Sequence, residues 1–426
     1  MGSGFFSVED MERHASWMSL RAWGWLGVCL GATVILATQG LADESSPSED
    51  TGPDTAALLR AVDLRATSLA EEELWASSAG GHRARLTLHP SLQEHVQSEF
   101  ARFDVPEGAV VAIEPATGRV LAYVSHQRSG MDWRDVARDA TPPAASVFKV
   151  ITGAALVDEG VGPDTRVCYS GGFSRLTDAD LQDNPRRDQR CGTLTEAMGG
   201  SINSIFAKLA VRHLDQDGLT RYASAFGFGH ALPFDLRTQA SRLEVPEERL
   251  EFARTAAGFW HMHLSPLHGA LIAATIANAG QMMRPAVVEE LISPEGVVIH
   301  ERIPEVFRSV IGANTAGIVG RMMERTVTRG TARRAFFDPD GNAFLPGIRV
   351  AGKTGTLTGS QPHRGYSWWV GFAPADDPQI AVAALVINEP RWRIKASYMA
   401  RETLRHYLLV SPPSSPDADA DAATAP

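Results

Sequence analysis

Residues 145–156 form a largely apolar run that contains one serine and one lysine, and this run constrains the fold more than any other part of the chain. A segment that is apolar on nearly all sides is expected to form a helix buried in a large domain. Pro142 and Pro143 precede it and favour a helix start near Ser146. Residues three apart share a helix face, so Ser146 and Lys149 would lie side by side. Because burial lowers the pKa of an amine, we expect Lys149 to act as a base that activates Ser146 as a nucleophile.

Composition narrows the class of function. The chain has 426 residues, 44% of them hydrophobic, so it can bury one large core or two ordinary ones. A net charge of −10 argues against nucleic acid as a partner, because phosphate binding requires a basic surface. Only four of the 40 basic residues are lysines, and arginine cannot release its proton in a protein. Lys149 and Lys353 are therefore candidates for amine chemistry, whereas Lys208 and Lys395 are interpreted as solvated helix lysines.

The N-terminal region carries a membrane signal. Residues 22–41 are uncharged and long enough to span a bilayer. Arg13 and Arg21 precede this stretch, and acidic residues follow it, which predicts a cytoplasmic N-terminus and export of everything after residue 42. We expect residues 1–42 to be a cytoplasmic tip and a single-pass anchor. Small residues at positions 40–42 leave a cleaved signal peptide as the alternative.

Export to an oxidising compartment would allow two of the cysteines to form a disulfide. Cys168 and Cys191 flank a polar, charged segment, and disulfides persist outside the cytoplasm. We therefore expect a Cys168–Cys191 disulfide that closes this segment, with two separate buried thiols as the alternative.

The chain after the anchor divides into three parts. Residues 43–84 are rich in Asp, Glu, Ser and Ala and are expected to form an acidic tether with one helix at 55–74. Residues 85–410 are expected to form a single globular body. Residues 411–426, SPPSSPDADADAATAP, are expected to be a disordered acidic tail.

The body has a mixed secondary-structure pattern. Apolar β-type runs occur at 109–114, 119–125, 348–356, 367–373 and 380–387. Helical patterns fill the middle of the body, and another follows at 394–409. This order predicts an α+β fold, in which a five-stranded antiparallel sheet is flanked by helices and joined by a mostly helical lobe. A cleft between the sheet and the lobe is the expected place for a site.

Three short motifs fall where they can line that cleft. Ser146-x-x-Lys149 begins the buried helix. Ser201-Ile202-Asn203 lies at a loop-to-helix junction, and the strand at 348–356 ends in Lys353-Thr354-Gly355-Thr356. Alone, each has an ordinary interpretation: a helix cap, a lysine whose amine reaches water, or a surface turn. Together and in this order, they match the signature of penicillin-binding proteins and class A β-lactamases.

With these motifs in place, residues 86–409 resemble the transpeptidase domain of penicillin-binding proteins. Segments 108–122, 264–280 and 369–374 extend the resemblance beyond the motifs. It implies a β-lactamase/transpeptidase-like fold on the extracytoplasmic (periplasmic) side of the bacterial inner membrane. It also implies peptidoglycan stem peptides ending in D-Ala-D-Ala as substrate, β-lactams as inhibitors, other cell-wall synthesis proteins as candidate partners, and neither cofactor nor metal.

The resemblance assigns a role to each motif residue. Ser146 attacks the carbonyl between two D-alanines and forms an acyl-enzyme, while Lys149 takes the hydroxyl proton. Ser201 passes a proton to the leaving amine, and Asn203 orients Lys149 and binds the substrate amide. Lys353 supplies positive potential near that amine.

The third motif also implies the binding groups. Thr354 and Thr356, on either side of Gly355, hold the terminal carboxylate of the substrate. The backbone N–H groups of Ser146 and Thr356 form the oxyanion hole.

Some features depart from the family pattern and leave rival functions open. We expect a minimal anchor-plus-transpeptidase form, because neither a glycosyltransferase domain nor a large pedestal domain is apparent. The same residues would serve a D,D-carboxypeptidase, in which water accepts the acyl group. A serine β-lactamase is disfavoured, since no E-x-x-x-N motif occurs between Asn203 and Lys353. A β-lactam-binding sensor without turnover is the non-enzymatic alternative.

Overall fold

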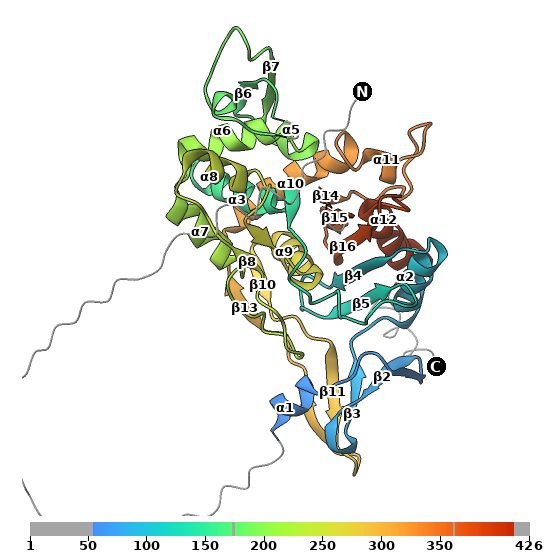
Figure 1. Cartoon of the computed structure of the whole chain (residues 1–426). Helices are drawn as coiled ribbons and strands as arrows, with labels where there is room; N and C mark the ends of the chain where they lie inside the picture. Colours follow the sequence, from blue (N-terminus) through green and yellow to red (C-terminus); the bar gives the residue numbers. More distant parts are fainter. Residues whose placement is uncertain (1–53, 173–174, 361–362, 413–426) are drawn as a thin grey trace, which may run out of the picture.

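The computed structural model describes residues 54–172, 175–360 and 363–412, and its centre is a five-stranded antiparallel sheet (Figure 1). The strand order is β14-β15-β16-β4-β5. Their bounds are Ala351–Ser360, His363–Ala373, Ile380–Asn388, Glu107–Ile113 and Val120–Gln127. The α+β class and the five-stranded antiparallel sheet predicted from the sequence are thereby confirmed.

Strand β16 lies in the middle of the sheet because its sequence is apolar on both faces. All nine of its residues are buried. Ala381, Ala383 and Leu385 join the core on one side of the sheet. Val382 and Ala384 join the core on the other side, as the alternation of side chains along a strand requires.

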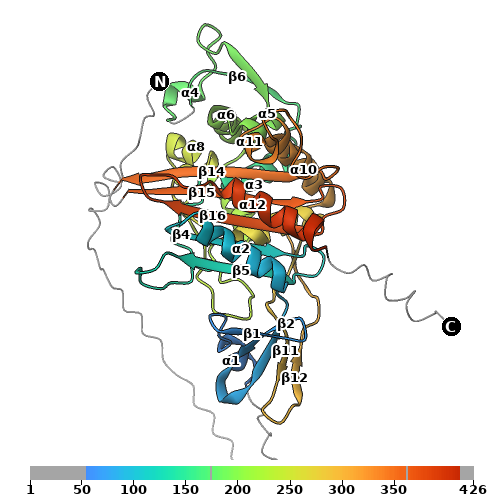
Figure 2. The same cartoon turned by 90° about the vertical axis from the view of Figure 1, so that its right-hand side faces the viewer.

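Helices cover both faces of the sheet (Figures 1 and 2). Helices α2 (Pro90–Arg102) and α12 (Ala396–Arg405) contribute apolar residues to one core, together with the one-turn π-helix His406–Val410. Helix α9 (Pro266–Ala277) packs on the opposite face and is buried along nearly its whole length.

The mostly helical lobe lies beyond α9, at the end of the molecule drawn uppermost in Figure 1. Its helices are α3 (Lys149–Asp158), α4 (Asp178–Leu181), α5 (Leu194–Gly200), α6 (Asn203–His213), α7 (Gln216–Ala225), α8 (Arg249–Ala256), α10 (Ala313–Thr328) and α11 (Arg333–Phe336). Two two-stranded ribbons accompany them: β6 (Arg166–Tyr169) with β7 (Arg190–Thr193), and β8 (Arg242–Leu243) with β9 (Met262–His263). A third ribbon, β10 (Gln281–Met283) with β13 (Val306–Ser309), lies between α7 and the lower end of the molecule in Figure 1.

A second five-stranded sheet corrects the prediction for residues 43–84. From Asp54 onward this segment is folded: helix α1 ends at Arg60 rather than at residue 74, and three strands follow it. The strand order is β1-β2-β3-β11-β12, with bounds Thr67–Ala70, Glu73–Ser77, Arg83–Leu86, Val288–Ile292 and Val298–Glu301. Arg85 of β3 joins the two halves through ion pairs to Glu73 at 2.8 Å and Glu290 at 2.7 Å.

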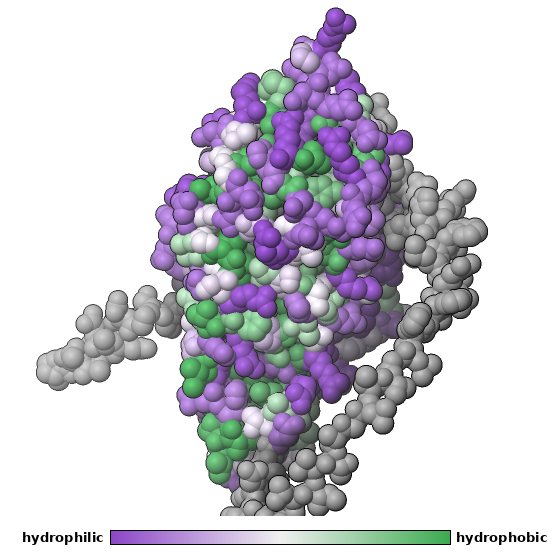
Figure 3. Space-filling model, turned by 90° about the vertical axis from the view of Figure 1, so that its left-hand side faces the viewer, coloured by the Kyte–Doolittle hydropathy of each residue, from purple (hydrophilic) through white to green (hydrophobic). Residues whose placement is uncertain are grey.

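The small sheet was missed because it is built from segments about 200 residues apart, each too short and too exposed to carry a clear pattern. It forms the lower end of the molecule in Figures 1 and 2. Figure 3 shows several hydrophobic residues on the surface of that end. Val297, Val298 and Ile303, in and just after the β11–β12 hairpin, are among the exposed apolar side chains. The chain after residue 53 therefore carries more than a tether and a transpeptidase-like body.

The expected anchor at 22–41 and most of the expected tail at 411–426 lie outside the described residues. Within residues 54–172, 175–360 and 363–412, none of the helices is both long enough and apolar enough to cross a bilayer.

Candidate active site

Ser146 lies in a tight 3-10 turn, Ala145–Phe148, which leads directly into the buried helix α3. The turn starts with Ala145 at φ 51°, a left-handed conformation that is unusual for a residue with a Cβ atom. The three-residue spacing brings the Lys149 amine to 2.9 Å from the Ser146 hydroxyl oxygen. Ser146 is half-buried. It also lies at the N-terminal end of α3, where the helix dipole favours developing negative charge.

The amine of Lys149 is fully buried and surrounded by acceptors. It donates one hydrogen bond to the Asn203 side-chain oxygen at 2.7 Å and another to the Ala257 carbonyl. A neutral amine has two N–H groups and one lone pair, so these two contacts leave the lone pair for the Ser146 hydroxyl. Burial, with the nearby Lys353 charge as a second cause, holds the pKa of Lys149 well below its ordinary value.

The second motif lies at a break between two helices. Helix α5 ends at Gly200, and Ser201 adopts a left-handed conformation with φ 54°. Helix α6 begins at Asn203, which is buried. The residue that caps α6 is Ile202, which makes no side-chain cap, so N-capping does not account for Ser201.

The third motif lies on β14, at the edge of the main sheet. Lys353 is fully buried and donates to the Ser201 hydroxyl at 2.9 Å and to the Thr354 carbonyl at 2.8 Å. Burial lowers the pKa of Lys353 to about 7. Thr354 is half-buried, whereas Thr356 is exposed.

Gly355 allows the strand to pass close to the turn that contains Ser146. A Cβ atom at this position would lie 3.2 Å from the Cβ of Ala145 and 3.3 Å from a Val147 methyl group. A Cβ atom here would therefore be tight against the turn, and its neighbours would have to shift slightly to admit it. The structure thus brings all three motifs to one place: Lys149 contacts Ser146 and Asn203, Lys353 contacts Ser201, and Gly355 packs against the serine turn.

Three further residues belong to this site. Ala257 contributes only its backbone carbonyl, to Lys149. Gly258 lies against the Ser146 turn at φ 78°, where a Cβ atom would be 2.6 Å from the Ala145 carbonyl oxygen. Thr331 forms a hydroxyl–hydroxyl hydrogen bond with Thr354. Sequence reasoning missed them because a backbone carbonyl has no sequence signature, and because a single glycine or threonine in a connecting segment resembles many others.

The segment between Cys168 and Cys191 packs against the helix that carries Asn203. The two cysteines face each other on β6 and β7 and are joined by a disulfide. The Ser204 hydroxyl donates to the Gly171 carbonyl at 3.0 Å, which ties this segment to the start of α6.

Lys208 corrects one prediction. Its side chain is fully buried rather than solvated, and it pairs with Asp188 at 2.6 Å and with Asp183 at 3.2 Å. It also donates to the Cys168 carbonyl at 2.9 Å. Lys395 is exposed, as expected. In the ranges that the structure describes, no three His, Cys, Asp or Glu side chains converge as a metal site requires.

Comparisons with known proteins agree with this geometry. Residues 108–405 match the family model of the penicillin binding protein transpeptidase domain. The chain is 30% identical over 341 residues to the peptidoglycan D,D-transpeptidase PbpA of Mycolicibacterium smegmatis, covering 72% of this chain and 67% of that protein. It is 28% identical over 328 residues to stage V sporulation protein D of Bacillus subtilis, covering 71% and 49% of the two chains.

Solved structures give the same result. The crystal structure of PBPA from Mycobacterium tuberculosis superposes with a TM-score of 0.64 at 26% identity, over 77% of this chain and 81% of that one. The ceftriaxone acyl-enzyme complex of penicillin-binding protein A from M. tuberculosis superposes with a TM-score of 0.63 at 27% identity, over 76% and 80% of the two chains. From the family-model match over most of its length, the chain belongs to the penicillin-binding protein transpeptidase family.

Proposed function

We propose that this protein is a peptidoglycan D,D-transpeptidase that works through an acyl-enzyme on Ser146 and is acylated by β-lactams. The observation that carries the proposal is the 2.9 Å contact between Ser146 and a buried lysine whose two N–H groups are taken by Asn203 and the Ala257 carbonyl. The names of the relatives, peptidoglycan D,D-transpeptidase and penicillin-binding protein, support the same reaction.

Acylation begins with the Ser146 hydroxyl. Its oxygen bonds to the carbonyl carbon of the penultimate D-alanine while its proton passes to the neutral amine of Lys149. The carbonyl oxygen becomes an oxyanion near the N-terminal end of α3. We assign the backbone N–H groups of Ser146 and Thr356 as its donors.

Collapse of this intermediate breaks the C–N bond to the last D-alanine. The leaving nitrogen needs a proton, and Ser201 is the group we assign to deliver it, because Lys353 holds its hydroxyl at 2.9 Å. A protonated Lys353 also attracts the terminal carboxylate of the substrate, with Thr354 and Thr356 as hydrogen-bond donors. In the second half-reaction, an amine from another stem peptide attacks the Ser146 ester, and the cross-link forms as the serine is released.

The placement of the reaction is part of the proposal. Peptidoglycan lies outside the cytoplasmic membrane, and the apolar stretch at 22–41 with its charge asymmetry would anchor the enzyme there as a single-pass protein. In a bacterial host, the full chain would then sediment with membranes, whereas a chain starting at residue 43 would not. Recovery of the full chain in the soluble fraction would contradict the anchor.

A fluorescent penicillin tests the chemistry. We expect the exported body, the chain from residue 43 onward, to become covalently labelled on Ser146. Mass spectrometry of the labelled peptide would identify the modified residue. Ser146→Ala should abolish labelling, whereas Ser91→Ala serves as a matched control, because Ser91 lies on α2, in the helix layer on the other face of the sheet. Persistent labelling of Ser146→Ala would overturn the proposal.

The fate of the acyl group separates the related activities. A label that persists for hours fits a transpeptidase, and a label that is lost within seconds indicates a β-lactamase. With a D-Ala-D-Ala donor peptide and an amine acceptor, a transpeptidase yields the cross-linked product. A D,D-carboxypeptidase yields only the shortened donor.

A further inference from the structure

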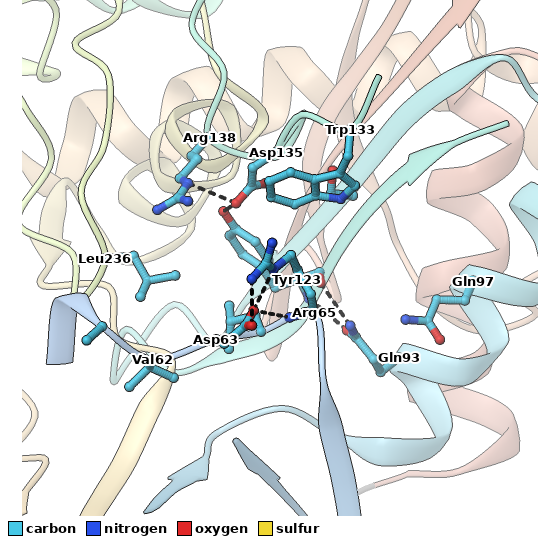
Figure 4. A pocket seen from close by; sticks show the side chains of 13 residues that line it. Val62, Asp63, Arg65, Gln93, Gln97, Tyr123, Trp133, Asp135, Arg138 and Leu236 are labelled. Carbon is cyan, nitrogen blue, oxygen red and sulfur yellow. Dashed lines mark hydrogen bonds and ion pairs between the residues drawn. The ribbon is translucent and has the colours of Figure 1, made fainter. Parts of the chain in front are cut away.

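A cavity of about 550 Å³ lies outside the site described above, at the junction between the small sheet and the main domain (Figure 4). Its walls come from residues 61–65 after α1, from helix α2, from strand β5 and from the segment that follows β5. Its volume falls within the roughly 300–1,000 Å³ of ordinary small-molecule sites. None of the three catalytic motifs lines it, so the reaction on Ser146 does not account for it.

The charged side chains that line the cavity are paired, so that positive and negative charges cancel. Arg65 binds Asp63 through two hydrogen bonds of 2.8 Å, and Arg138 pairs with Asp135 at 2.8 Å. The Tyr123 hydroxyl donates to the same Asp135 at 2.9 Å. Each arginine thus has its own carboxylate, as Figure 4 shows, and the lining carries no net charge. A phosphate or a carboxylate ligand would have to displace these carboxylates, so an uncharged ligand fits better.

One wall presents an unusual aromatic surface. The Trp133 side chain is 56% exposed, although tryptophan is normally highly buried. The Arg65 guanidinium lies 5.4 Å from its ring centroid, within the range of a cation–π contact. Among the residues that the structure describes, neither the Trp133 indole N–H nor the Gln97 side-chain amide has a hydrogen-bond partner. Both are available to a ligand.

We propose that this cavity binds an uncharged glycan chain, and specifically that it holds the polysaccharide whose stem peptides reach Ser146. A sugar ring has an apolar C–H face that packs on an indole, and hydroxyl and amide groups around its edge. The planar side-chain amide of Gln97, which has both a donor and an acceptor group, matches that edge. The inference rests on the proposed function, because the glycan is the carrier of the proposed substrate.

The chain connects the cavity to the site. Trp133, Asp135 and Arg138 belong to the stretch that leads directly from β5 to the nucleophile turn. This stretch is well held, since Val136 N–H donates to the Ser125 hydroxyl at 2.9 Å and Leu267 N–H donates to the Ala137 carbonyl at 2.8 Å. Strands β5 and β14 are the two edges of the main sheet, four inter-strand spacings or roughly 20 Å apart. An extended peptide of about six residues covers that distance.

Calorimetry with the N-acetylglucosamine tetramer tests the proposal on the exported body. We expect saturable binding, and we expect Trp133→Ala to weaken it at least about tenfold while Trp133→Phe retains most of it. Trp75→Ala is the matched control, because Arg83 lies over Trp75 in the same manner, at 4.6 Å, away from the cavity. It should bind the tetramer like the wild type.

Two results would overturn the inference: no saturable binding by the wild type, or equal losses in Trp133→Ala and Trp75→Ala. Labelling of Ser146 by fluorescent penicillin, measured on the same preparations, keeps the two proposals distinguishable. Normal labelling without tetramer binding removes the glycan site alone. Tetramer binding without labelling removes the proposed reaction and leaves the site in place.

Discussion

Lys149 and Lys353 are both fully buried, and within the described ranges neither ammonium has a carboxylate partner. Lys208 is equally buried but pairs with Asp188 at 2.6 Å. A buried amine without a counter-charge is costly to keep protonated, so the two unpaired lysines release their protons more readily. The contrast separates two lysines with lowered pKa values, which contact Ser146 and Ser201, from one that holds a structural segment in place.

Replacing Lys149 by arginine should abolish acylation, although the positive charge is retained. A guanidinium does not release its proton near neutral pH and cannot accept one from Ser146. We expect the second-order rate constant for penicillin acylation to fall about 10²–10⁴-fold, the usual contribution of a general base. Lys395→Arg, at the exposed N-cap of α12, should acylate normally. Acylation of Lys149→Arg at the wild-type rate would contradict the base assignment.

The charge of Lys353 should produce a basic limb in the pH dependence of acylation. The rate should fall as Lys353 loses its charge around its pKa of about 7, while burial holds the pKa of Lys149 well below its ordinary value and so favours the neutral base. We expect Lys353→Arg to lose the basic limb, because the guanidinium stays charged. The measurement is the acylation rate constant from about pH 5 to pH 10. A basic limb that stays unchanged in Lys353→Arg would show that another group titrates there.

As pH rises and Lys353 loses its proton, the stability of the fold should increase while the acylation rate falls. Its pKa is about 7 in the folded protein against 10.5 ordinarily, so the unfolded chain binds more protons between these values and stability rises with pH across this window. Lys353→Met should therefore be inactive, yet at least as heat-stable as the wild type at pH 7, with a smaller difference near pH 9.5.

Lys208→Met is the matched comparison for that experiment. It leaves Asp188 buried without its partner, which costs roughly 3–5 kcal/mol in other proteins. The test is to compare the Tm values of Lys353→Met and Lys208→Met with that of the wild type at pH 7. Equal losses in Tm would mean that Lys353 is structural in the same sense as Lys208.

The main sheet and the contact between Ser146 and Lys149 were predictable from local patterns. The continuous apolar run of β16 can lie only in the middle of a covered sheet, and the i, i+3 spacing alone places Lys149 beside Ser146. These features depend on neighbouring residues in the chain, so periodicity and spacing reveal them.

The parts that were missed depend on distant segments. The strand β3 finds its partner β11 about 200 residues later, and neither is apolar enough to indicate a sheet. The burial of Lys208 depends on Asp183 and Asp188, which reach it only because the segment between the two cysteines folds back on α6. A sequence pattern does not show which acidic residue returns to which lysine.

Removing the Cys168–Cys191 disulfide should destabilise the lobe. The bridge closes a loop with a sequence separation of 23, and such a loop contributes about 3 kcal/mol. We expect the double variant Cys168→Ser/Cys191→Ser to melt roughly 5 °C below the wild type. Reductant should lower the Tm of the wild type by a similar amount and leave the double variant unchanged. A melting point that does not respond to reductant would contradict a stabilising bridge.

Gly258 should be as necessary as the residues that take part in the reaction. Its φ of 78° is costly for any other residue, and a Cβ atom would press on the Ala145 carbonyl oxygen at 2.6 Å and on the Ser146 Cα at 3.0 Å. We expect Gly258→Ala to acylate about 10²-fold more slowly, because a displacement of about 1 Å is enough for such a loss. Gly229→Ala is the matched control, since Gly229 has a φ of 82° and nothing within 4 Å of its added Cβ atom. That variant should lose stability by about 1 kcal/mol and keep its acylation rate. Equal acylation rates in the two variants would mean that the contact behind Ser146 does not position the nucleophile.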